Sequence, residues 1–190
     1  MTEQFSFEDL KNRFNTNKKF KFGTYIVAGI IGVTVLYFSY RQFIWGPANE
    51  KSNDGWWVAL NYVTKDSTDQ AIRLLEPFVK NNDGKTGGEI AQYLLATQYM
   101  EKGKFTAALK MLEGVNLEDT YVSTMSIGLQ GDCYSQMKKY NDALELYLEA
   151  AEREDNEFTT PVYLFKAGLV CDKKLNKKSD AAAHYQRIKD

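Results

Sequence analysis

The chain has 190 residues, a length that suits one domain or at most two. Its 24 basic and 25 acidic side chains give a net charge of -1, which argues against a nucleic-acid-binding protein with its usual basic excess. A content of 44% hydrophobic and 14% aromatic residues excludes a disordered chain. One histidine and two cysteines exclude most closed zinc sites, since such a site needs four ligands.

Residues 1–21 are polar and hold five basic and three acidic side chains. A run of 19 residues follows, Phe22 to Tyr40, in which tyrosine is the only side chain that ionises. As a helix rising about 1.5 Å per residue, this run would be roughly 28 Å long, which matches the apolar core of a bilayer. A helix buried in a soluble core, the alternative, normally keeps a polar stripe. We therefore predict a cytoplasmic tail over 1–21 and a transmembrane helix, in contact with lipid, over 22–45.

The charges beside this run predict its orientation. Lys18, Lys19 and Lys21 precede it, whereas Arg41 and Lys51 are the only basic residues in the 20 positions that follow. Because basic residues stay on the cytoplasmic side, we expect a single pass with the N-terminus inside and residues 46–190 outside. The run exceeds the apolar region of a signal peptide and no A-x-A site follows it, which favours a retained anchor over a cleaved signal.

Two further patterns belong to the same segment. Aromatic side chains gather near its far end, where they are expected at the lipid–water interface: Tyr37, Tyr40, Phe43 and Trp45. Ala28 and Gly32 form a small-xxx-small spacing, at which a second membrane helix can approach closely. We take Ala28 and Gly32 as candidate helix-packing residues.

Residues 46–190 show helical spacing of apolar residues, without the sustained alternation of strands. One pattern recurs with a period of 35 to 38 residues, marked by Ala71, Ala108, Ala143 and Ala181. Small residues also recur one helix earlier, at Ala96, Gly131 and Gly168. Small side chains let two antiparallel helices cross closely, and the large residues beside them fill the remaining space.

This pattern resembles the tetratricopeptide repeat, in which each unit is a hairpin of two helices. We place four units at about 52–82, 88–119, 124–157 and 161–190. The first unit has Thr68 where an aromatic residue is usual, and the last carries a one-residue insertion in its turn. The predicted fold is all-α, an N-terminal transmembrane helix followed by a solenoid of about four hairpins over 46–190.

A stack of such hairpins curves into a superhelix whose concave face is lined by the first helices. The usual geometry of the repeat then predicts a partner-binding groove. Its expected lining residues are Trp56, Leu60, Tyr93, Thr97, Asp132, Gln136, Phe165 and Leu169. Two alternatives stay open: Trp56 caps the open end of the stack together with Trp57, and Phe165 belongs to the core.

No catalytic, cofactor-binding or metal-binding residue is predicted. His184 has no second histidine and no nucleophile at a familiar spacing. Gly84-Lys85-Thr86 ends like a phosphate-binding loop, but Val79 stands where the loop needs glycine, so we interpret it as a turn between units. Cys133 and Cys171 fall in neighbouring units, about 10 Å apart by the expected stacking, which is too far for a disulfide.

The complete layout is similar to the YfgM-like family, single-pass tetratricopeptide subunits of the bacterial SecYEG translocon. Residues 155–168, DNEFTTPVYLFKAG, are similar to the segment between the last repeats of some members. The resemblance implies a bacterial inner-membrane protein with a periplasmic repeat domain. It also implies three kinds of protein partner: the SecYEG translocon, a membrane-anchored PpiD-like chaperone and exported polypeptides.

Three functional hypotheses from different classes follow. The first is a non-catalytic adaptor of the translocon and its chaperone. The second is a scaffold in another envelope machine, such as cell division, outer-membrane assembly or a dedicated secretion system, with an organelle receptor as its variant. The third is an enzyme, for which the sequence supplies neither a nucleophile with a base nor a cofactor loop.

Overall fold

The structure is a computed structural model that describes residues 6–117 and 119–189. Parts of the predicted tail, of the second unit and of the fourth unit, at 1–5, 118 and 190, lie outside the described residues. Within these two ranges every regular element is helical and none is a strand, so the predicted all-α class is confirmed. The chain divides into two compact units, Met1–Ala48 and Asn49–Asp190, which we describe separately.

The first unit begins with two helices, α1 (Phe7–Thr16) and α2 (Lys18–Tyr40). The hydroxyl of Ser6 accepts a hydrogen bond from the backbone N–H of Glu8 and caps α1. The side-chain oxygen of Asn17 accepts from the N–H groups of Lys19 and Phe20 and caps α2. Helix α1 lies within the predicted polar tail, for which no helix was expected.

No residue of α2 is buried. A π-helix (Arg41–Trp45) continues α2, and its Arg41 guanidinium lies 4.4 Å from the centroid of the Trp45 ring. The helical segment Lys18–Val63 contains the one stretch of the described residues that is long and apolar enough to cross a membrane by length and composition. Ala28 and Gly32 both lie on the exposed surface of α2.

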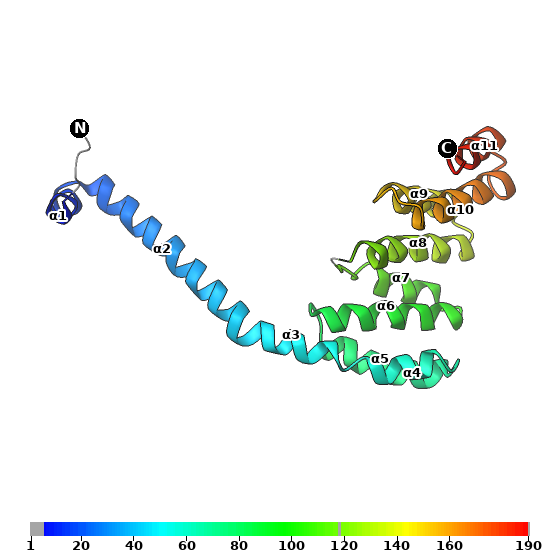
Figure 1. Cartoon of the computed structure of the whole chain (residues 1–190), viewed down its shortest axis with the longest axis horizontal. Coiled ribbons are helices and arrows are strands. Elements are labelled where there is room, and N and C mark those ends of the chain that lie inside the picture. The colour runs from blue at the N-terminus through cyan, green and yellow to red at the C-terminus, as the bar shows by residue number, and fades with distance from the viewer. Residues whose placement is uncertain (1–5, 118, 190) are drawn as a thin grey trace. The chain divides into compact units, whose positions relative to one another are not determined.

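Over residues 49–117 and 119–189, the second unit forms four antiparallel hairpins. Figure 1 shows them stacked in chain order. They follow α3 (Gly46–Asn53), which crosses the boundary between the two units. The hairpins pair α4 (Trp57–Val63) with α5 (Thr68–Asn81), α6 (Thr86–Glu101) with α7 (Phe105–Leu112), α8 (Thr120–Gln136) with α9 (Tyr140–Glu152), and α10 (Thr159–Lys173) with α11 (Lys178–Arg187). Three first helices begin slightly before the predicted units, at 86, 120 and 159 rather than 88, 124 and 161.

Small residues lie at the helix crossings of the stack. The four repeating alanines, Ala71, Ala108, Ala143 and Ala181, are all at most 3% exposed. Gly131 packs against the ring of Tyr147, where an added Cβ would lie 2.7 Å from Cε1, and Gly168 packs against Tyr185 in the same way. These contacts show why large side chains repeat one helix away from the small ones.

Each hairpin turn holds one residue in the left-handed region of backbone space. The four are Asp66, Gly103, Lys138 and Asn176, with φ between 51° and 68°. Each stands five positions before the buried alanine of its second helix, so the four turns share one geometry. The extra residue of the last unit lies in the turn, as predicted, because two residues separate the end of α10 at Lys173 from Asn176, whereas one residue separates α6 from Gly103 and α8 from Lys138.

The turn before α6 contains Gly84-Lys85-Thr86, as predicted. Gly84 has φ 65°, and α6 begins at Thr86. The side-chain oxygen of Asn49 accepts a hydrogen bond of 2.8 Å from the backbone N–H of Thr86, and Gly87 packs against the backbone of Ser52. Residues of α3 thus hold the start of α6, and this turn has a structural role.

Candidate partner-binding surface

The eight predicted groove residues lie in the first helices of the four hairpins, or directly before one, and none of them is fully buried. Trp56 and Leu60 lie in the first hairpin and are half-buried. Trp56 packs on the cluster around Ala59 and Leu75 and stacks on Trp57, with ring centroids 4.3 Å apart. This packing favours the alternative in which Trp56 caps the end of the stack.

The two predicted residues of α6 are also half-buried. Tyr93 packs on the cluster that contains Ala96 and Leu112, and burial raises the pKa of its hydroxyl. The hydroxyl of Thr97 donates a 2.7 Å hydrogen bond to the carbonyl oxygen of Leu94, so it serves its own helix. Neither side chain offers a large contact area to a partner.

Asp132 on α8 connects two units of the stack. Its Oδ1 accepts a 2.7 Å hydrogen bond from the hydroxyl of Tyr147 on α9. The ammonium group of Lys166 on α10 donates to both carboxylate oxygens of Asp132, at 2.8 and 2.7 Å. The same ammonium lies 5.6 and 5.7 Å from the ring centroids of Tyr147 and Tyr163. We name these four residues the Asp132 network.

Burial and the Asp132 carboxylate raise the pKa values of the two tyrosines of the network. Burial, followed by the hydrogen bond to Asp132, raises the pKa of Tyr147 far above its ordinary value. Burial first, then the charges of Asp132 and Tyr93, raise the pKa of Tyr163 to about 12. Both hydroxyls therefore resist ionisation even in alkaline solution, and the hydrogen bonds of the network join α8 to α9 and α10.

Two open hollows flank Asp132 along α8. One has a volume of about 350 Å³ and is lined by Asp132, Ser135, Tyr147, Lys166, Leu169, Val170, Lys173 and Lys174. The other, of similar volume, is lined by Met100, Glu101, Phe105, Asp132, Ser135, Gln136 and Tyr147. Gln136 and Leu169 are exposed and line one hollow each, so the structure places three predicted residues beside each other here.

Exposed apolar residues extend from this region along α8 and α10. Phe158, directly before α10, and Val162, Phe165 and Leu169 within it stand four, three and four positions apart, which places them in one stripe of the helix. Together with Tyr121 and Met125 of α8, these residues are between 36% and 67% exposed. We name this set the α8–α10 apolar surface; it comprises Tyr121, Met125, Phe158, Val162, Phe165 and Leu169.

One ring contact joins the α8 and α10 parts of this surface. The rings of Tyr121 and Phe158 meet edge to face with centroids 6.2 Å apart, and α8 and α10 contact each other. Phe165 lies beside Tyr185 of α11, with centroids 5.9 Å apart, yet half of it remains exposed. Phe165 and Leu169 were predicted from the sequence and the other four were not, although Phe158 and Val162 share the helical spacing of Phe165 and Leu169.

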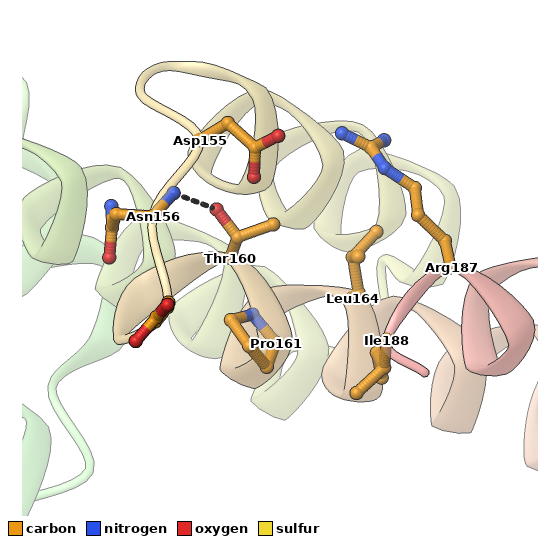
Figure 2. A pocket seen from close by; sticks show the side chains of 8 residues that line it. Asp155, Asn156, Thr160, Pro161, Leu164, Arg187 and Ile188 are labelled. Carbon is orange, nitrogen blue, oxygen red and sulfur yellow. Dashed lines mark hydrogen bonds between the residues drawn. The ribbon is translucent and has the colours of Figure 1, made fainter. Parts of the chain in front are cut away.

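A third hollow, of about 500 Å³, lies between the α9–α10 loop and the end of α11 (Figure 2). Pro161, Leu164 and Ile188 supply its apolar wall. Asn156 lies at the edge of this hollow. Its N–H donates to the Thr160 hydroxyl at 3.0 Å, and its side-chain oxygen accepts from the N–H of Thr159 at 2.8 Å. Asn156 therefore caps the start of α10, which gives this residue of the segment 155–168 a structural role.

The residues with catalytic or metal-binding chemistry stay dispersed. Cys133 and Cys171 are buried and are not joined in a disulfide, and burial raises the pKa of both thiols. Within residues 6–117 and 119–189, no three His, Cys, Asp or Glu side chains lie close enough together to hold a metal ion.

Comparisons with known proteins identify the repeat. A family model described as tetratricopeptide repeat-like domain matches residues 53–168, which is more than half of the chain. A comparison with curated proteins finds no match. Tetratricopeptide repeats are typically non-catalytic modules that bind other proteins.

Solved structures share the fold at low sequence identity. A structure titled "Crystal structure of MamA" is 18% identical, with a TM-score of 0.61, over 74% of this chain and 75% of that one. A MamA fragment from Desulfovibrio magneticus RS-1 is 17% identical, with a TM-score of 0.59, over 72% of this chain and 75% of that one. A third, "Crystal structure of MamA protein", is 16% identical with a TM-score of 0.62 and covers 94% of this chain and 89% of that one. The hairpin stack and the family match together establish that this chain belongs to the tetratricopeptide repeat-like domain family.

Proposed function

We propose that this protein is a non-catalytic, membrane-anchored scaffold that binds a protein partner through the α8–α10 apolar surface. The observation that carries the proposal is the exposure of six large apolar side chains on two consecutive first helices. Monomeric proteins rarely expose a continuous apolar patch without a binding role. Aromatic and aliphatic side chains of this kind supply most of the binding energy at protein interfaces.

The charge beside this surface suggests the chemistry of the partner. Lys166, Lys173 and Lys174 line the hollow next to Leu169. Asp132 and Asp172 pair with two of these lysines, which leaves a net positive charge at this hollow. A partner segment with apolar side chains followed by an acidic one would match both features.

Crosslinking in native membranes tests this surface. A photoreactive amino acid at Val162 is expected to capture the partner, whereas the same group at Glu145, an exposed residue of α9, captures none. Val162→Ser combined with Leu169→Ser should weaken partner affinity by about tenfold or more, since two apolar contacts are lost. Helicity should not change, because both side chains are exposed. Equal capture from Val162 and Glu145 would reject this surface as the binding site.

We further propose that α2 crosses the bacterial inner membrane, with the N-terminus in the cytoplasm and the repeats in the periplasm. The exposed apolar surface of α2 and the excess of lysine before it support this topology. Protease added to cells with a permeabilised outer membrane is expected to degrade the repeats, and intact cells should protect them. Protection of the repeats until the inner membrane is lysed would reverse the proposed topology.

Within this topology, the finer proposal is an adaptor between the SecYEG translocon, a PpiD-like chaperone and exported polypeptides. Two resemblances to the YfgM-like family support it. One is the layout, in which a basic segment and one apolar helix precede a short repeat array. The other is the sequence of residues 155–168. The crosslinked partners identified by mass spectrometry decide between this role and another envelope machine. Recovery of division or outer-membrane assembly proteins without translocon subunits would favour the second role.

A further inference from the structure

Helix α1 has one apolar face. Phe7, Leu10 and Phe14 are three and four positions apart, which places them on the same side of a helix that turns by about 100° per residue. Phe7 is 82% exposed and Leu10 is 43% exposed. A ten-residue helix that presents two large apolar side chains to its surroundings needs a surface to cover them.

The charges of α1 are sorted around this face. On the helical projection, Lys11 and Arg13 fall beside the apolar stripe, whereas Glu8 and Asp9 fall on the opposite side. Three more basic residues, Lys18, Lys19 and Lys21, follow in the first turn of α2. Basic residues beside an apolar face, with acidic residues away from it, are typical of helices that lie in the headgroup region of an anionic membrane.

The junction with α2 fixes the position of this face. Asn17 has extended backbone angles, φ -107° and ψ 105°, which end α1 before α2 begins. The ring of Phe14 meets Tyr25 of α2 edge to face, with centroids 5.7 Å apart, and the Lys21 ammonium lies 5.4 Å from the Phe14 centroid. Figure 1 shows α1 almost end-on beside the first turns of α2, which runs across the view. The two helix axes therefore cross, and α1 is level with the start of the apolar run.

We infer that α1 lies in the plane of an anionic lipid surface, on the side of the membrane where α2 begins. Phe7 and Leu10 enter the boundary between headgroups and acyl chains, and Lys11 contacts lipid phosphates. The inference rests on the proposal that α2 spans the membrane. It adds a second lipid contact, which would hold α2 at one depth while the repeats bind their partner.

Spin labels on the full-length protein in vesicles of phosphatidylcholine and phosphatidylglycerol test this inference. Single cysteines are introduced by Leu10→Cys on the apolar face, Asn12→Cys on the polar face and Ile30→Cys within α2. The buried Cys133 and Cys171 are expected to resist labelling, and the labelled wild type measures this background. Collisions with oxygen report a lipid environment, and collisions with a water-soluble nickel complex report an aqueous one.

The label at Leu10→Cys is expected to collide with nickel several-fold less often than the label at Asn12→Cys. Equal nickel collisions at these two sites, with Ile30→Cys protected, would overturn the inference and leave the membrane span intact. Exposure of Ile30→Cys to nickel would instead remove the span and the inference with it. Equal protection of Leu10→Cys in vesicles of phosphatidylcholine alone would overturn the choice of an anionic surface.

Discussion

Replacing Gly128 with valine is expected to lower the free energy of unfolding of the repeat domain by about 2 to 3 kcal/mol, because the added atoms overpack a filled site. A Cβ at this position would fall on the ring of Tyr163, against Cε1 and Cζ. Tyr163 cannot move away easily, since it is 6% exposed and packs in the core cluster of Ile127 and Ala167. The contact joins the third and fourth units, so the loss should separate the last hairpin first.

Urea unfolding in detergent, followed by circular dichroism, measures the effect of Gly128→Val. The double variant Gly128→Val/Tyr163→Ala provides the control, because truncation of the ring removes the obstacle. The two substitutions should then be strongly non-additive, with the double variant more stable than the sum of the separate losses predicts. A wild-type midpoint for Gly128→Val would mean that Tyr163 moves aside without cost.

The period of the hairpins could be predicted because it rests on local rules. A small residue recurs in each second helix, and the apolar spacing around it is helical. The burial of Ala71, Ala108, Ala143 and Ala181 follows directly from that pattern. A helix over the long uncharged run could be predicted equally well, because α2 and the π-helix that continues it include the predicted residues 22–45.

The contacts between units could not be predicted in the same way. Gly128 meets Tyr163 across 35 positions, and Asp132 meets Lys166 across 34. Both contacts depend on how one hairpin is set against the next, which the repeat pattern alone does not specify. Asp132 was therefore placed in the groove as a contact for a partner, whereas the structure gives its carboxylate two partners within the stack.

Helix α1 and the start of the α8–α10 apolar surface were not predicted, although the spacing of their apolar residues in the sequence indicates both. Helix α1 was taken as a polar tail because its charges were counted, while the spacing of Phe7, Leu10 and Phe14 was not considered. The start of the α8–α10 apolar surface was not predicted, because its residues lie away from the small residues at the helix crossings that define the repeat pattern. Val162 and Phe158 lie one and two turns before Phe165, on the same stripe of α10.

Replacing Asp132 with alanine is expected to destabilise the repeat domain by about 2 to 3 kcal/mol, because the variant leaves partly buried donors without their acceptor. The Lys166 ammonium and the Tyr147 hydroxyl both donate to this carboxylate. The side chains of Asp132 and Lys166 are 25% and 33% exposed, so water replaces the lost bonds only in part. Glu152→Ala is the matched control, since it removes an exposed 3.5 Å pair with Arg187 and should change stability little.

A double-mutant cycle with Lys166→Met separates this structural role from a role in binding. If the network acts within the stack, Asp132→Ala/Lys166→Met should lose clearly less stability than the sum of the single losses, since no unpaired ammonium remains. Partner affinity, measured where each variant is fully folded, should then depend on Val162 and Leu169 far more than on Asp132. Additive losses of stability, or a loss of affinity in a fully stable Asp132→Ala variant, would show instead that this carboxylate contacts the partner directly.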